Sequence, residues 1–85
     1  MKDVQFSHRA LQQLQEWEKT DKKVYQRIDI LLKAIQDTPF FGIGKPEALK
    51  HQLKGYWSRR ITREHRLVYR VTDTSIIVIS CRYHY

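Results

Sequence analysis

The spacing of apolar residues differs between the two halves of the chain, and the first half predicts a strand followed by a helix. Val4 and Phe6 alternate with polar neighbours, which favours a short first strand. Ser7 comes next, and its hydroxyl is suited to cap the N-terminus of a helix. Within that helix three apolar residues recur at intervals of three, and we expect them on one face: Leu11, Leu14 and Trp17.

A second amphipathic helix is predicted after Asp21, which is another residue type that caps helices. The helix should end at Thr38-Pro39, because the proline ring disfavours helical geometry in the residue before it. The two helices then form a hairpin with one apolar side, which needs a sheet to cover. The apolar residues of the second helix recur at intervals of 4, 3, 1 and 3: Val24, Ile28, Leu31, Leu32 and Ile35.

The second half predicts an irregular loop over 40–53 and then a sheet. Alternation in the first two strands puts Arg60 and Arg66 on one exposed face only if their hairpin loop holds an odd number of residues, for example Arg63-Glu64-His65. We expect this odd loop. Three strand candidates follow the irregular loop: Tyr56–Thr62, Arg66–Thr72 and Ser75–Tyr83.

The last strand candidate contains Ile76-Ile77-Val78-Ile79, which is apolar on both faces and is therefore typical of a central strand. Its register stays open at this point. The order strand, helix, helix, strand, strand, strand predicts one α+β domain over residues 1–85. In that domain the helical hairpin packs on one face of a twisted antiparallel sheet.

The positive charge is concentrated in the second half of the chain. The 85 residues carry a formal net charge of +7. Residues 1–37 hold seven basic and six acidic residues, whereas residues 38–85 hold nine basic and three acidic residues. The net charges are therefore +1 and +6, so the basicity should form a patch on the loop and sheet. A polyanion is the expected partner of such a patch, and a basic surface without a ligand is the alternative.

Several protein classes are excluded or disfavoured by residue types. Cys81 is the single cysteine, so an intramolecular disulfide cannot form, and a reducing cytoplasm is the expected compartment. The chain starts without the apolar run of a signal peptide, and nothing approaches the 18 apolar residues of a membrane span. The histidines and Cys81 lack the close spacing of a zinc site, so we expect no metal and no cofactor.

The residue types that metal-free RNA cleavage requires are all present in the basic half. Such a reaction needs a base for the 2′-hydroxyl proton, an acid for the leaving 5′-oxygen and a cation for the phosphate. Four of the candidates also have plainer interpretations: Glu47 as a solvated loop carboxylate, His84 as a frayed terminal residue, and Arg60 with Arg66 as ordinary edge charges. The candidates are Lys45, Glu47, Lys50, His51 and Lys54 from the loop, Arg60, Arg66 and Arg70 from the strands, and His84 and Tyr85 from the end.

Two aromatic pairs are also considered. Tyr83 and Tyr85 could stack on bases or pack under the helices. Trp17 and Trp57 are expected in the core. His65 is expected in a turn, and no role is inferred for it from the residues alone.

Four ordered blocks of the chain closely resemble the YoeB toxins of the RelE superfamily. They are Gly44–His51, Gly55–Ile61, Glu64–Tyr69 and Cys81–Tyr85. The first half matches more loosely and in the same order, including Trp17 and Thr20-Asp21-Lys22, so the resemblance covers nearly the whole chain. Ala48 stands where that family often has a proline, which leaves the proposed catalytic positions intact.

The resemblance implies a fold like that of small microbial ribonucleases and a ribosome-dependent mRNA endonuclease. Toxins of this family cut mRNA in the ribosomal A site and halt translation. Matched block by block, the resemblance assigns Glu47 as general base, Arg66 to the scissile phosphate and His84 as general acid. The expected RNA-binding residues are Lys45, Lys50, Arg60 and Tyr85.

The resemblance also implies partners: a YefM-like antitoxin whose disordered tail folds over the toxin, and a second copy in a homodimer. Two other functions remain open. One is a toxin of the same fold that binds DNA gyrase, as ParE-like relatives do, and cleaves nothing. The other is a plain RNA-binding module in which the basic patch supplies affinity only.

Overall fold

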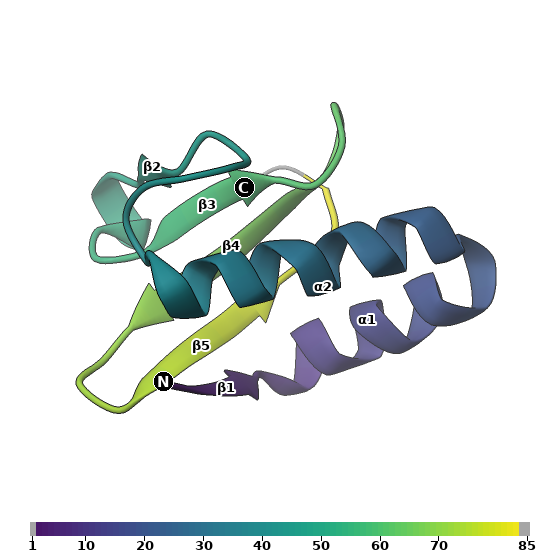
Figure 1. The fold of residues 1–85 in the computed structure, drawn as a ribbon, viewed down its shortest axis with the longest axis horizontal. Coiled ribbons are helices and arrows are strands. Elements are labelled where there is room, and N and C mark those ends of the chain that lie inside the picture. The colour runs from purple at the N-terminus through teal and green to yellow at the C-terminus, as the bar shows by residue number, and fades with distance from the viewer. Residues whose placement is uncertain (1, 84–85) are drawn as a thin grey trace.

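Two helices lie against one face of a five-stranded sheet (Figure 1). The computed structural model describes residues 2–83, so His84 and Tyr85 lie outside the described residues. The elements are β1 (Asp3–Phe6), α1 (His8–Thr20), α2 (Lys22–Asp37), β2 (Glu47–Ala48), a 3₁₀ turn (His51–Leu53), β3 (Trp57–Arg60), β4 (Arg66–Val71) and β5 (Ser75–Ser80).

Both helices begin at the predicted caps. The Ser7 hydroxyl accepts a hydrogen bond from the amide of Ala10 at 3.1 Å, and the Asp21 carboxylate accepts from the amides of Lys23 and Val24 at 3.1 and 3.3 Å. Such caps satisfy amides that have no partner inside the helix. Helix α2 ends at Asp37, directly before the predicted stop at Thr38.

The buried face of α2 is the predicted stripe, whereas the buried face of α1 differs from the prediction. Val24, Ile28, Leu31 and Ile35 are buried. In α1 Ala10 is fully buried and Leu11 is 42% exposed, so the inward face follows Ala10, Leu14 and Trp17. Spacings of four and three track a 3.6-residue turn better than two steps of three, which explains why Leu11 leaves the face.

The sheet is mixed, which corrects the expectation of a wholly antiparallel sheet. Its order is β1-β5-β4-β3-β2, and β1 pairs parallel to β5 while all other pairs are antiparallel. The helical hairpin and three other strands separate β1 from β5 in the chain, so no tight turn forces that pair to be antiparallel. The interior position of β5 confirms the predicted central strand.

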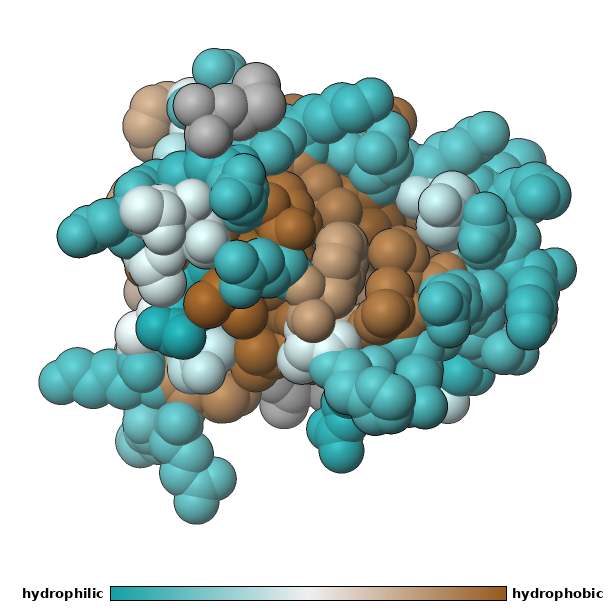
Figure 2. Space-filling model, turned by 90° about the horizontal axis from the view of Figure 1, so that it is seen from below, coloured by the Kyte–Doolittle hydropathy of each residue, from teal (hydrophilic) through white to brown (hydrophobic). Residues whose placement is uncertain are grey.

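Part of the apolar layer remains at the surface. Figure 2 shows apolar side chains in the middle of the face seen from below, surrounded by hydrophilic ones. A groove between the helices and β1 has apolar residues in its wall, with polar residues at its margin. These lining residues are Val4, Phe6, Leu14, Tyr25, Ile28, Asp29, Leu32, Lys33 and Gln36.

The β3–β4 hairpin has the predicted odd loop. Arg60 pairs with Arg66 and Trp57 pairs with Tyr69, so five residues, 61–65, form the loop. The loop is longer than the three-residue example because β3 ends at Arg60. The parity is nevertheless as expected, and Leu67 and Tyr69 point into the core while Arg60 and Arg66 do not.

Candidate active site

The face of the sheet away from the helices brings three predicted site residues together. Glu47 pairs with Ser58 across β2 and β3, and Arg60 pairs with Arg66 across β3 and β4. Directly opposite residues of an antiparallel pair point to the same side, as do residues two apart on one strand. Glu47, Arg60 and Arg66 therefore share one face.

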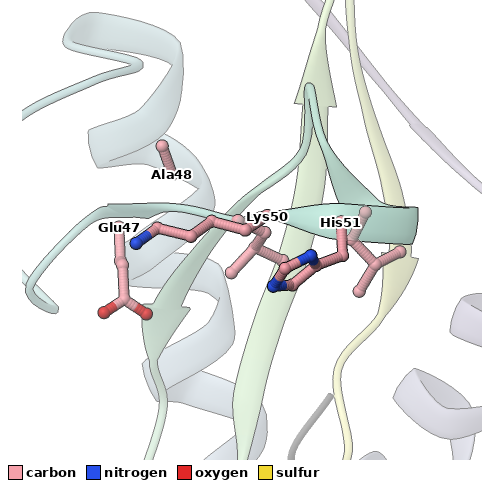
Figure 3. Close-up of a pocket in the computed structure, with 6 residues that line it drawn as sticks. Glu47, Ala48, Lys50 and His51 are labelled. Carbon is pink, nitrogen blue, oxygen red and sulfur yellow. The ribbon is translucent and has the colours of Figure 1, made fainter.

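Strand β2 lies within the segment that was expected to be an irregular loop. Its Glu47 and Ala48 pair with Ser58 and Trp57, so the carboxylate is held at the edge of the sheet. Figure 3 shows the Glu47 carboxylate and the His51 ring on one side of this segment, with the Ala48 methyl on the other. An open pocket of about 560 Å³ adjoins them and is lined by Glu47, Ala48, Leu49, Lys50, His51 and Leu53.

Lys45 and Lys50 lie on either side of β2, and both are exposed. Lys45 and His51 have φ angles of 51° and 59°, in the left-handed region that residues with a side chain seldom adopt. Tyr83, with a φ of 64°, completes the set of non-glycine residues with positive φ among residues 2–83. All three lie in segments that border the site, and such conformations often occur at functional sites.

Arg66 is held by the hairpin loop. Its Nη1 donates to the carbonyls of Thr62, Arg63 and His65 at 2.9, 3.1 and 3.1 Å. Within residues 2–83 the hydrogen bonds of this guanidinium all use Nη1. A guanidinium carries five N–H donors, on Nη1, Nη2 and Nε. Because the loop carbonyls accept from Nη1, the donors on Nη2 and Nε are the ones that can bind an anion.

Arg59 holds the segment that leads into β2, and sequence reasoning missed this residue. It is fully buried, although charged, and its guanidinium donates to backbone carbonyls of the segment that follows α2. The acceptors are the carbonyls of Thr38, Phe41 and Ile43 and the hydroxyl of Tyr69. The signal was its parity, because Arg59 alternates in phase with Trp57 and Ile61 and therefore faces the helices.

Gly44 lies in the same segment between α2 and β2. Its carbonyl accepts from the Arg60 amide at 2.7 Å, and its φ is 84°. A Cβ at this position would lie 2.9 Å from the Leu31 side chain. The backbone therefore passes against α2 where only glycine fits, three residues before Glu47.

The C-terminal segment turns back beside Arg66. The Cys81 amide donates to Gln13 Oε1 at 2.7 Å, and Trp17 Nε1 donates to the Cys81 carbonyl at 2.9 Å. Beyond it, the Tyr83 amide donates to His65 Nδ1 at 2.8 Å, and the Tyr83 carbonyl accepts from the Arg66 amide at 3.1 Å.

The structure distinguishes among the aromatic predictions. Tyr83 is 59% exposed, so it does not pack under the helices. Trp17 and Trp57 pack partly buried against the core, as expected. His65 lies between β3 and β4, and its hydrogen bond to Tyr83 is a role that the sequence alone did not indicate. The predicted roles of His84 and Tyr85 fall outside the described residues.

Two groups with shifted pKa values lie in the core, away from this face. Burial raises the pKa of the Cys81 thiol to about 12. Burial also raises the pKa of Tyr69, and the neighbouring Arg59 opposes that rise. Within residues 2–83 no cluster of three His, Cys, Asp or Glu side chains could hold a metal ion, and no helix there could cross a membrane.

The chain matches a family model described as YoeB-like toxin of bacterial type II toxin-antitoxin system, over residues 6–85. It belongs to this family. Toxin YoeB of Escherichia coli K12 is 59% identical over 69 residues, which cover 81% of this chain and 82% of the relative. Toxin YoeB of Mycobacterium bovis is 48% identical over the full length of both chains.

Solved structures of YoeB toxins have the same fold. The YoeB/ParE toxin from Agrobacterium tumefaciens has a TM-score of 0.95 at 44% identity over the whole of both chains. A Staphylococcus aureus YoeB dimer gives 0.93 at 47% identity, over 99% of this chain and 98% of the other. The Escherichia coli YafQ H87Q mutant gives 0.81 at 16% identity, over 99% and 94%, and shows the shared fold alone. The predicted α+β, RelE-like fold class is confirmed.

Proposed function

We propose that this YoeB-like toxin is a metal-independent endoribonuclease that cuts mRNA in the ribosomal A site. The observation that carries the proposal is the shared face of Glu47, Arg60 and Arg66 on the sheet, away from the helices. The Tyr83 backbone, to which His84 is bonded, is held against Arg66 at the edge of this face. The proposed base, the cations and the residue to which the proposed acid is bonded therefore lie in one region.

In the proposed reaction, Glu47 removes the proton from a 2′-hydroxyl group. The oxygen then attacks the adjacent phosphorus, and the bond from phosphorus to the 5′-oxygen breaks. His84 gives a proton to that oxygen, so the products are a 2′,3′-cyclic phosphate and a 5′-hydroxyl. Arg66 stabilises the charge on the phosphate oxygens as it grows, through the Nη2 and Nε donors that the hairpin loop leaves available.

The surrounding cations support binding of RNA. Lys45 and Lys50 flank the carboxylate, and Arg60 is exposed opposite Arg66. Contacts from such side chains to phosphates supply affinity without sequence preference. We assign these three residues to backbone binding and Tyr85 to orientation of the substrate. Because the substrate is mRNA on the ribosome, the proposed compartment is the cytoplasm.

The proposed protein partners are a YefM-like antitoxin and a second copy of the toxin. Solved structures include a heterotetrameric YoeB-YefM complex and a YoeB dimer, both from Staphylococcus aureus. These relatives are 46% and 47% identical to this chain over nearly all of its length. A chain of 85 residues has a small core and gains stability from such a partner.

The decisive experiment strips bound metal from the purified toxin with EDTA, removes the chelator, incubates the toxin with programmed ribosomes, and maps the ends of the mRNA. Cleavage confined to the A-site codon is expected, and the same mRNA without ribosomes should stay intact. Intact A-site codons would overturn the proposal. A gyrase supercoiling assay on the same preparation tests the ParE-like alternative, and His84→Gln should abolish cleavage while ribosome binding persists.

A further inference from the structure

We propose that His65 is a positioning residue: it fixes the Tyr83 backbone, to which His84 is bonded, next to Arg66. The structural part of this inference depends only on contacts within residues 2–83. Its consequence for cleavage rests on the proposed function.

The backbone of Tyr83 is held on both sides by consecutive residues. Its N–H donates to His65 Nδ1 at 2.8 Å, and its carbonyl accepts from the Arg66 N–H at 3.1 Å. The carbonyl carbon of Tyr83 is bonded to His84. The imidazole and the Arg66 amide therefore hold both ends of the Tyr83 backbone unit to which His84 is covalently bonded.

Tyr83 needs such support because its backbone is strained. Its φ of 64° lies in the left-handed region, which disfavours residues with a Cβ. A conformation of this kind persists where surrounding contacts impose it. The hydrogen bond from the Tyr83 amide to the imidazole is a side-chain contact that acts directly on this backbone.

The imidazole is itself held in place. The Trp17 ring meets it edge-on, with centroids 4.8 Å apart at 73°. The His65 amide donates to the Thr62 hydroxyl at 3.1 Å, and the Ile61 amide donates to the His65 carbonyl at 3.0 Å. The same carbonyl accepts from Arg66 Nη1 at 3.1 Å. His65 therefore contacts both Tyr83 and the guanidinium that is proposed to bind the phosphate.

Arg82, in the C-terminal segment after β5, contacts the rings of Trp17 and Tyr83. Its guanidinium carbon lies 5.5 Å from the Trp17 ring centroid and 4.9 Å from that of Tyr83. The Tyr83 ring lies 5.5 Å from the imidazole. Trp17 of α1, His65 of the hairpin loop and Tyr83 of the tail thus form one aromatic cluster with Arg82.

The chemistry of the contact specifies the state of the imidazole. An acceptor at Nδ1 requires the neutral tautomer with its proton on Nε2. A residue that replaces His65 must therefore offer an acceptor at the same distance from the backbone. The asparagine Oδ1 lies two bonds from Cβ, as Nδ1 does, whereas leucine has similar bulk and offers no acceptor. Glutamine places its oxygen one bond farther out.

The experiment compares His65→Asn, His65→Leu and His65→Gln with the wild type. Cleavage rates are measured in single turnover at saturating programmed ribosomes, and ribosome binding is measured separately. We expect His65→Leu and His65→Gln to cut about 10–100-fold more slowly, because small displacements of a catalytic group have effects of this size. His65→Asn should recover to within about fivefold, and binding should change less than about twofold in all three.

A merely structural role predicts a different pattern. In that case cleavage would follow the melting temperature, and His65→Asn would rescue nothing. Wild-type cleavage by His65→Leu, or equal rates for His65→Asn and His65→Leu, would overturn the inference. Because His65→Asn and His65→Gln keep a polar side chain, they decide the matter even where the leucine variant fails to fold.

Nuclear magnetic resonance of the free toxin separates this inference from the proposed function. The wild type should show the Nε2–H tautomer at His65 and slow hydrogen exchange at the Tyr83 amide. His65→Leu should exchange that amide at least about tenfold faster, and His65→Asn should not. Protected exchange in the wild type together with absent cleavage would refute the nuclease alone. Fast exchange in the wild type would refute the positioning role alone.

Discussion

Arg59 and Arg60 are consecutive residues of β3 whose guanidinium groups lie on opposite faces of the sheet. Arg59 is fully buried against the segment that leads into β2, and Arg60 is exposed opposite Arg66. The alternation of a strand separates the two charges. One arginine therefore holds the frame of the candidate site, and its neighbour lies on the face proposed to bind RNA.

Because the two guanidinium groups lie on opposite faces, replacing each arginine with methionine should affect a different property, stability in one case and cleavage in the other. Arg59→Met should lower the free energy of unfolding by about 2–4 kcal/mol, because three backbone carbonyls and the Tyr69 hydroxyl lose their charged donor. Arg60→Met should change it by less than about 0.5 kcal/mol and weaken ribosome-dependent cleavage instead. Urea unfolding and end-mapping of mRNA measure the two effects. Equal destabilisation by both variants would contradict this division.

The close approach of Gly44 to α2 predicts a second matched pair. Gly44→Ala should lower the free energy of unfolding by about 2–4 kcal/mol, from a strained φ and a methyl group 2.9 Å from Leu31. Gly55→Ala is the control, because its φ of 96° is similarly unfavourable and its Cβ would meet nothing within 4 Å. The control should cost about 1–2 kcal/mol, from the backbone alone. Urea unfolding should therefore show the larger loss for Gly44→Ala, and the reverse order would refute the packing argument.

The proposed base gives a third prediction. Glu47→Gln should slow A-site cleavage by about 100–10,000-fold, because the amide cannot accept the 2′-hydroxyl proton. Stability should change by at most about 1 kcal/mol, since Glu47 is exposed and charged contacts of exposed side chains contribute no more than that. Glu64→Gln is the control: this exposed carboxylate lies in the hairpin loop near Arg66 and has no proposed role. A nuclease that tolerates Glu47→Gln as well as Glu64→Gln needs another base.

Local features of the sequence predicted the helices and the parity of the hairpin. Ser7 and Asp21 act on amides two or three residues away, so their roles depend little on the rest of the fold. The shared face of Arg60 and Arg66 followed from alternation within two adjacent strands. These are interactions over short distances in the chain.

The misplacement of Leu11 was a local error of helical spacing, whereas the other misses depend on distant partners. Strand β2 has two residues and exists because Glu47 and Ala48 pair with Ser58 and Trp57. The direction of β1 depends on the path of the helical hairpin. Strand parity puts Arg59 on the side of the helices, but the carbonyls that accept from its guanidinium lie up to 21 residues away and could not be identified from the sequence. The hydrogen bond between His65 and Tyr83, which is 18 residues away, could not be predicted from the sequence for the same reason.

The buried thiol of Cys81 gives a prediction about pH. Burial raises its pKa to about 12 from an ordinary value of 9.0, so the unfolded chain ionises this thiol at lower pH than the folded chain does. Folding then retains a proton that unfolding releases, and stability should fall as pH rises from 9 toward 12, by at most about 1.4 kcal/mol per pH unit. Cys81→Ala should be less stable at pH 7, because it leaves a cavity, but should lose less on going from pH 9 to 10. Tyr69 contributes a loss of the same sign in both proteins, mainly above its ordinary pKa of 10.0. Urea unfolding at pH 7, 8, 9 and 10 measures the slopes, and parallel curves for the two proteins would show that Cys81 is not the group responsible.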